Sequence, residues 1–215
     1  MMLKNIWLIP TITLLGFGAG SHEAIAQTTY PFNTTYNAQI SNSPLEQTDT
    51  EVILQTSVTG ESANAPYGLT NLTINNYSSV NLATGVATYD SDPAVFGLEN
   101  LPLGTLTLSS EGSDKLFGTN RGTASLESGT GTITITGGEG RFVGASGTLD
   151  LSQTITSNPD PTGVSAPIIS PATISGSFQV VPEPSTNATL IGISMIGVGF
   201  LLRRRTSGSA ASLSK

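Results

Sequence analysis

The amino-acid sequence predicts an all-β protein, a single antiparallel β-barrel or sandwich of about eight strands, in residues 27–180. Short runs in which apolar and polar residues alternate recur along this region, and this is the period of a strand with one buried face. Clusters of Gly, Asn, Asp, Ser and Pro separate the runs, as turns require. No segment of the region repeats with the helical period, so we expect one domain built from strands.

Each run assigns certain side chains to the buried face of the sheet, while β-branched Thr suits the outer face. Two stretches, 89–102 and 157–171, are predicted to be loops or edge segments because their prolines cannot donate to a central ladder. The side chains predicted to point inward are, in chain order, Val52, Leu54, Val58, Leu72, Ile74, Val80, Leu82, Val86, Leu106, Leu108, Ile133, Ile135, Leu149, Leu151, Ile155, Ile174, Phe178 and Val180.

Residues 1–26 have the pattern of a secretory signal peptide. Lys4 precedes an apolar stretch, and Ala24 and Ala26 form an A-x-A cleavage pattern, so the mature chain is predicted to begin at Gln27. The alternative, a permanent membrane anchor, is disfavoured because Pro10 and several glycines interrupt a stretch that is short for a span. We therefore expect the protein to be exported.

Removal of this segment restricts the available chemistry. The chain has no Cys, and its single His, His22, and single Trp, Trp7, both lie in the predicted signal peptide. A cysteine nucleophile, a zinc–thiolate site and a Ser-His-Asp triad are thus excluded from the mature chain. We predict no enzyme activity, no catalytic residue, no cofactor and no metal site.

The charge balance excludes one class of partner. Between residues 27 and 184, fourteen acidic side chains face three basic ones, Lys115, Arg121 and Arg141. Such an acidic surface repels phosphate backbones, so nucleic acid is not an expected partner.

The stretch "GTGTITITGGEGRFVGASGTLDLSQTIT", residues 129–156, is rich in glycine. A strand follows the glycines instead of the helix that a nucleotide-binding loop needs, so we expect a turn or bulge with Phe142 pointing inward. The stretch resembles the "GGTGxFxGAxG" signature of the dirigent and allene oxide cyclase families, which implies an eight-stranded barrel with a central cavity. The matching positions are Gly137, Gly138, Gly140, Phe142, Gly144, Ala145 and Gly147, with Glu139 replacing the usual Thr.

A few charged residues admit two interpretations. Arg141 is a contact for an anion at the barrel mouth or, more commonly, the partner of an acid such as Glu139 or Asp150. The pairs Asp90 with Asp92 and Glu111 with Asp114 suit calcium ligands, but these residue types are also ordinary in turns. The ion pair and the solvated turn are the favoured interpretations.

Residues 181–205 form a distinct C-terminal signal. An extended Pro-Glu-Pro element precedes an uncharged stretch at 188–202, predicted to be a transmembrane helix, and three arginines then keep their end cytoplasmic. This order resembles the PEP-CTERM protein-sorting signal, which implies an exosortase-type processing enzyme as partner; a plain single-pass anchor predicts the same topology without cleavage. Residues 206–215 are predicted to be a disordered tail. The sorting residues are Pro182, Glu183, Pro184, Arg203, Arg204 and Arg205.

Two functions fit these observations. The first is a secreted, non-enzymatic protein of the cell surface or of an exopolysaccharide-associated extracellular matrix, reached through an inner-membrane intermediate. The alternative is a dirigent-like or allene oxide cyclase-like barrel that binds or isomerises a small hydrophobic ligand. The first predicts an interior filled by Leu, Ile, Val and Phe, and the second an open cavity with a few convergent polar groups. A weak calcium-dependent adhesin is a third possibility.

Overall fold

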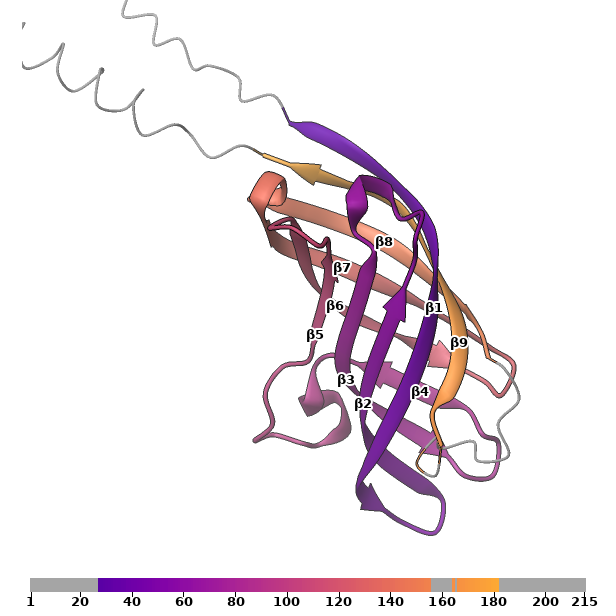
Figure 1. The fold of residues 1–215 in the computed structure, drawn as a ribbon. Coiled ribbons are helices and arrows are strands. Elements are labelled where there is room, and N and C mark those ends of the chain that lie inside the picture. Colours follow the sequence, from indigo (N-terminus) through magenta and orange to yellow (C-terminus); the bar gives the residue numbers. More distant parts are fainter. Residues whose placement is uncertain (1–26, 156–163, 165, 182–215) are drawn as a thin grey trace, which may run out of the picture.

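The computed structural model describes residues 27–155, 164 and 166–181, and Figure 1 shows that they form one curved sheet. The described part contains nine strands and three short 3₁₀ turns, η1 (Pro66–Gly68), η2 (Pro93–Phe96) and η3 (Gly140–Phe142). The strands are β1 (Thr28–Gln47), β2 (Glu51–Glu61), β3 (Asn71–Asn81), β4 (Ala87–Asp90), β5 (Thr105–Ser109), β6 (Lys115–Ala124), β7 (Ser128–Glu139), β8 (Ala145–Thr154) and β9 (Ile168–Val180).

The sheet closes on itself as an antiparallel ring. From β2 the order runs through β1, β9, β8, β7, β6 and β4 to β3, and β3 pairs again with β2. The short strands β4 and β5 share one position, because both bridge β3 and β6 at different heights. The nine strands therefore occupy eight positions around the ring, which confirms the predicted antiparallel all-β ring and distinguishes it from an open sandwich.

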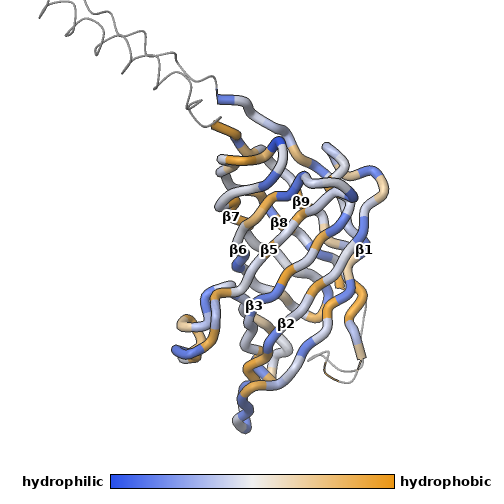
Figure 2. The backbone as a smooth tube through the Cα atoms, turned by 60° about the vertical axis from the view of Figure 1, so that its left-hand side comes forward, coloured by the Kyte–Doolittle hydropathy of each residue, from blue (hydrophilic) through white to orange (hydrophobic). Residues whose placement is uncertain are grey.

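The alternating pattern assigned most inward side chains correctly, and Figure 2 shows hydrophobic and hydrophilic residues alternating along the strands. Two predicted positions were wrong: Leu82 and Val86 are exposed. They lie in the turn between β3 and β4, where Asn81 Oδ1 accepts the backbone N–H groups of Ala83 and Thr84, both at 3.0 Å. The turn ends the period-two alternation, so the pattern does not continue through it.

The stretch 157–171 was predicted to be a loop or an edge segment; its residues 168–171 belong to a strand, and residues 157–163 and 165 lie outside the described part. Strand β9 begins at Ile168 and therefore includes Pro171, which lies opposite Asn37 of β1. The pairing of β9 with β8 reaches only as far as Ala172. Pro171 thus has a strand neighbour on one side only, which is where a strand tolerates a residue without an N–H donor. In the same way, the start of the predicted loop at 89–102 belongs to β4.

One end of the barrel interior is filled with aromatic rings, and we call it the packed end. Phe142 and Phe178 are fully buried with ring centroids 5.4 Å apart, and Tyr30 stacks on Phe178 at 5.3 Å. The turn η1 closes this end, where the Tyr67 hydroxyl donates to the Pro31 carbonyl oxygen at 2.7 Å. Such edge-to-face and stacked pairs add to the stabilisation from burial alone.

Candidate functional site

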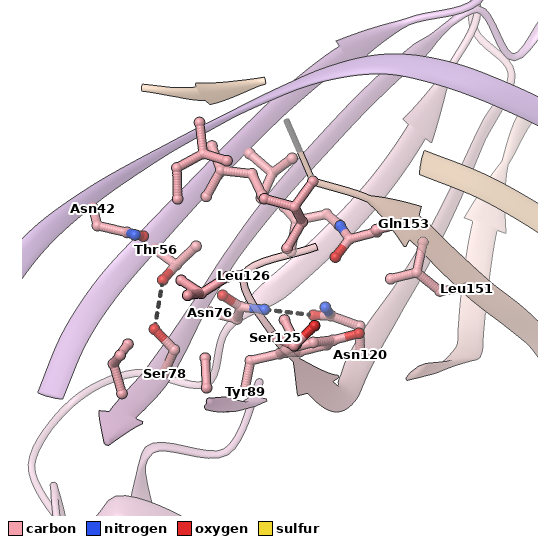
Figure 3. A pocket seen from close by; sticks show the side chains of 18 of the residues that line it. Asn42, Thr56, Asn76, Ser78, Tyr89, Asn120, Ser125, Leu126, Leu151 and Gln153 are labelled. Carbon is pink, nitrogen blue, oxygen red and sulfur yellow. Dashed lines mark hydrogen bonds between the residues drawn. The ribbon is translucent and has the colours of Figure 1, made fainter. Parts of the chain in front are cut away.

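The opposite end of the barrel, which we call the hollow end, contains a cavity of about 140 Å³ (Figure 3). Inward positions of β1, β2, β3, β4, β6, β8 and β9 line it, together with the turns after β3 and β6. The interior is therefore filled at one end and open at the other. Its lining comprises Ile40, Asn42, Thr56, Val58, Ile74, Asn76, Ser78, Val80, Gly85, Ala87, Tyr89, Asn120, Ala124, Ser125, Leu126, Leu151, Gln153, Ile155 and Ile168.

One wall of the cavity is polar and internally hydrogen-bonded. The hydroxyls of Thr56 on β2 and Ser78 on β3 lie 3.0 Å apart, and both side chains are buried. Inside the barrel, Asn76 Nδ2 of β3 donates to Asn120 Oδ1 of β6 at 3.2 Å (Figure 3). These groups take inward positions between apolar ones, since Asn76 and Ser78 stand between Ile74 and Val80.

Ser91, in the segment between β4 and β5, contacts Asn120. Ser91 follows β4 directly, and its hydroxyl donates to Asn120 Oδ1 at 3.1 Å while its Oγ accepts the Asn120 backbone N–H at 2.9 Å. The chain leaves the barrel wall after Ser91 and returns at Gly104, whose N–H donates to the Ser91 carbonyl oxygen at 2.7 Å. An added Cβ at Gly104 would approach the Asn75 carbonyl oxygen to 2.4 Å, so the return path requires glycine.

Tyr89 of β4 supplies an aromatic face to the cavity. Its hydroxyl donates to the Thr130 carbonyl oxygen at 3.1 Å, and burial raises the pKa of Tyr89 to about 12. The phenol therefore stays protonated at neutral pH. Gly122 and Gly131 make room for the ring, because a Cβ at either would come within 2.5 Å of the Tyr89 oxygen.

The remaining wall and the mouth are mainly apolar, with Asn42, Gln153 and Ser125 as their polar members. Ile40, Leu151 and Ile168 line the wall formed by β1, β8 and β9. At the mouth, Leu126 on the β6–β7 turn lies against Gly85 on the β3–β4 turn, where an added Cβ would meet the Leu126 side chain at 3.0 Å. The cavity thus combines a mainly apolar wall and rim with uncharged hydrogen-bonding groups that gather on the wall formed by β2, β3 and β6.

The predicted glycine motif lies at the packed end and not at the cavity. A register shift opposite Phe117 and Gly118 forms a bulge in β7, and Gly140, Gly144 and Gly147 have φ of 64°, 78° and 148°. Phe142 is fully buried, as expected, and Ala145 is buried beside it. The motif therefore has a structural role here: its glycines allow the β7–β8 turn to cover the aromatic cluster.

Arg141 forms an ion pair, but with a different acid from the two predicted. Its Nε donates to Asp114 Oδ2 at 2.8 Å, and its backbone N–H donates to Asp114 Oδ1 at 2.9 Å. The predicted partner Glu139 instead pairs with Lys115 at 2.8 Å. The pairing of β6 with β7 decides this, because it sets Lys115 directly opposite Glu139.

The carboxylates proposed as calcium ligands accept backbone hydrogen bonds. Asp90 Oδ1 accepts the N–H of Asp92 at 2.8 Å, and Asp92 Oδ1 accepts the N–H of Ala94 at 3.0 Å, so Asp92 caps η2. Among residues 27–155, 164 and 166–181, no three His, Cys, Asp or Glu side chains gather in a group that would hold a metal ion.

The last strand leads directly into the C-terminal signal. Val180 is buried at the end of β9 and lies opposite Thr28, where β1 begins, so both ends of the barrel domain lie at the packed end. Residues 180–205 match the family model described as the PEP-CTERM protein-sorting motif. The chain carries a PEP-CTERM sorting motif. No curated protein and no solved structure matches the chain.

The PEP-CTERM motif implies exosortase-dependent sorting to the cell envelope or the extracellular space. The matched range contains the six predicted sorting residues at 182–184 and 203–205, which lie outside the described residues, as do the predicted signal peptide and the helix at 188–202. Within the part of the chain that the structure describes, no helix is long and apolar enough to cross a membrane. The resemblance of the glycine motif to dirigent proteins stays a prediction.

Sequence reasoning missed the polar residues of the cavity, although the pattern contains a signal for them. Thr56 follows Leu54 and precedes Val58 at the inward period, and Asn76 and Ser78 interrupt an apolar series in the same way. A polar residue at an inward position is the informative exception in a strand. The polar residues at inward positions of β2 and β3 therefore indicate this wall of the cavity.

Proposed function

We propose that this protein is an exported, non-enzymatic binding protein of the cell envelope or extracellular matrix, and that its barrel holds a small ligand at the hollow end. The observation that carries the proposal is the cavity of about 140 Å³, with its polar and apolar walls. Small-molecule sites are typically concave and largely apolar, with a few placed polar groups.

The difference between the two ends of the interior supports a binding role. Aromatic rings fill the packed end, whereas the side chains around the cavity of about 140 Å³ lack packing partners on one side. A ligand that binds this cavity in the folded protein would stabilise the fold by mass action.

The position of the sorting motif supports the same proposal. The motif begins at Val180, at the packed end, whereas the cavity lies among the turns of the opposite end. A chain held by its C-terminal segment would thus present the packed end toward the attachment point. The cavity mouth stays accessible before and after processing.

A cavity-filling variant tests the binding role. Ala87 lines the cavity, and Ala87→Phe should abolish saturable binding of 1-naphthol and naphthalene to the exported protein, measured by probe fluorescence. The matched control is Thr88→Phe, because Thr88 is exposed on the outer face of the same strand, and binding should persist there. The proposal fails if wild-type protein binds neither probe, or if Ala87→Phe binds both as well as wild type does.

The delivery route has its own test. We propose that an exosortase-type enzyme removes the segment after the Pro-Glu-Pro element from an inner-membrane intermediate, which residues 188–202 anchor with the three arginines in the cytoplasm. Cell fractionation followed by mass spectrometry should find a mature C-terminus near Pro184, outside the inner membrane. Intact protein ending at Lys215 in the inner membrane would contradict cleavage and support the plain anchor.

A further inference from the structure

One acceptor in the polar wall lacks a partner. Asn76 is 4% exposed, its Nδ2 is committed to Asn120, and its Oδ1 makes no hydrogen bond within the described residues. Asn120 Oδ1 accepts from Asn76, and the Ser91 hydroxyl lies within hydrogen-bond distance of Asn120 Oδ1 at 3.1 Å and of the Asn120 carbonyl oxygen at 3.2 Å. Figure 3 shows this hydrogen-bonded pair among the side chains that line the cavity.

An unpaired buried acceptor destabilises the fold, because it has lost its hydrogen bonds to water without replacing them. The inner face of β3 carries Ile74 and Val80 on either side, so an apolar side chain at position 76 would fit the local pattern without this cost. A bound group that donates a hydrogen bond to Asn76 Oδ1 would remove the cost and make it a source of selectivity.

The neighbouring hydroxyls supply the complementary half. Thr56 and Ser78 share one hydrogen bond, and each hydroxyl carries a single hydrogen, so the pair retains one donor hydrogen beyond its own bond. Ser78 is the next inward residue after Asn76 on β3. The wall therefore offers an acceptor and a donor at successive inward positions, and a ligand hydroxyl can pair with either one because it both donates and accepts.

Charge on the ligand is disfavoured. The cavity lining within the described residues consists of apolar, amide, hydroxyl and phenol side chains. An ion that enters such a site loses its hydration without gaining a counter-charge. A neutral molecule keeps the contacts of its apolar body with Leu151 and Ile168 and avoids this penalty.

Resting on the proposed function, we infer that the ligand is an uncharged amphipathic molecule whose hydroxyl group binds Asn76 Oδ1 while its apolar body lies against the opposite wall. The ligand class is thus a small apolar alcohol or phenol. Asn76 is the residue that determines specificity, and Asn120 and Ser91 are positioning residues.

Three probes of similar shape test this inference on the exported full-length or processed protein: 1-naphthol, naphthalene and 1-naphthoate. We expect 1-naphthol to bind about tenfold more tightly than naphthalene, because one satisfied buried acceptor is worth about a factor of ten. The charged 1-naphthoate should bind least. Titration calorimetry or probe fluorescence gives the three dissociation constants.

Two variants separate specificity from folding. Asn76→Leu should bind naphthalene at least as well as wild type and lose the preference for 1-naphthol, with no loss of thermal stability. Asn75→Leu is the matched control, since Asn75 is the exposed outward neighbour on the same strand, and it should keep the tenfold preference.

The outcomes are distinguishable from failure of the proposed function. If no probe binds to wild type, the proposed function itself is wrong. If naphthalene and 1-naphthol bind equally well, or if Asn76→Leu keeps the preference, the cavity binds ligands but the hydroxyl inference is overturned. Tightest binding of 1-naphthoate would overturn the neutral ligand class.

Discussion

The packed and hollow ends of this barrel use one alternating strand pattern with different side chains. At the packed end, the inward positions carry rings such as Phe32, Tyr36 and Phe178. At the hollow end, the inward positions of β2 and β3 carry Thr56, Asn76 and Ser78, and a cavity remains between them and the apolar wall. The alternation decides which side chains point inward, and their size and polarity decide whether the interior is filled.

Two leucines on one strand provide the most direct test of this difference, and the largest expected effect. Leu149 and Leu151 are both buried on the inner face of β8, but only Leu151 lines the cavity. Leu149→Ala should create a new void and lower the free energy of unfolding by about 4–5 kcal/mol, near the top of the range for such truncations. Leu151→Ala removes atoms that already border open space, so we expect about 2–3 kcal/mol.

Urea unfolding of the two variants measures these losses, provided that the slopes of the transitions agree. Equal losses would show that the hollow end is packed as tightly as the rest of the barrel. A probe that binds the cavity should raise the stability of wild type and of Leu149→Ala alike, because the cavity lies outside the truncated site.

A pair of adjacent glycines gives the next largest effect, at the packed end. An added Cβ at Gly138 would lie 2.5 Å from the Phe142 carbonyl oxygen and 2.6 Å from that of Lys115, whereas at Gly137 it meets nothing within 4 Å. Gly138→Ala should therefore cost about 1–3 kcal/mol through overpacking. Gly137→Ala should change the stability by less than about 0.5 kcal/mol.

Thermal unfolding of the two glycine variants makes the comparison. A similar loss at both positions would show that the motif depends on glycine for backbone freedom along its whole length. A loss at Gly138 alone ties the motif to the close approach of the β7–β8 turn over Phe142.

Alternation in the sequence predicted which face of most strands is buried, but it did not predict where every strand ends. Alternation placed Leu106, Ile133 and Phe178 inside correctly, because a strand with one buried face repeats every two residues. It failed at Leu82 and Val86, where a turn that Asn81 stabilises interrupts the period. Local pattern thus predicts faces well and the exact ends of strands poorly.

The candidate site depends on contacts that no local pattern encodes. Asn76 and Asn120 are 44 residues apart, and Arg141 and Asp114 are 27 apart. Each pair meets only because the ring brings particular strands together in a particular register. The polar residues at inward positions were visible in the sequence, but their partners, and the cavity between them, follow from the closed sheet.

The smallest expected effect concerns Asp114, at the surface of the packed end. The backbone N–H of Arg141, and then its guanidinium, hold the pKa of this carboxyl below its ordinary value of 3.8. Because the folded-state pKa is the lower one, the stabilisation is complete above the ordinary pKa and is lost as the pH falls through the folded-state value. We therefore expect the stability difference between wild type and Asp114→Asn to shrink as the pH is lowered from about 6 to about 2.

Arg141→Gln separates the two contributions, because it removes the guanidinium and keeps the backbone N–H that donates to Asp114 Oδ1. The backbone hydrogen bond is the larger cause of the lowered pKa, so this variant should keep most of the pH dependence while Asp114→Asn loses that part of it. Urea unfolding at a series of pH values in constant salt gives both curves. If Arg141→Gln removes the pH dependence as fully as Asp114→Asn, charge and not the turn backbone holds this carboxylate, and the β7–β8 turn depends on an exposed ion pair.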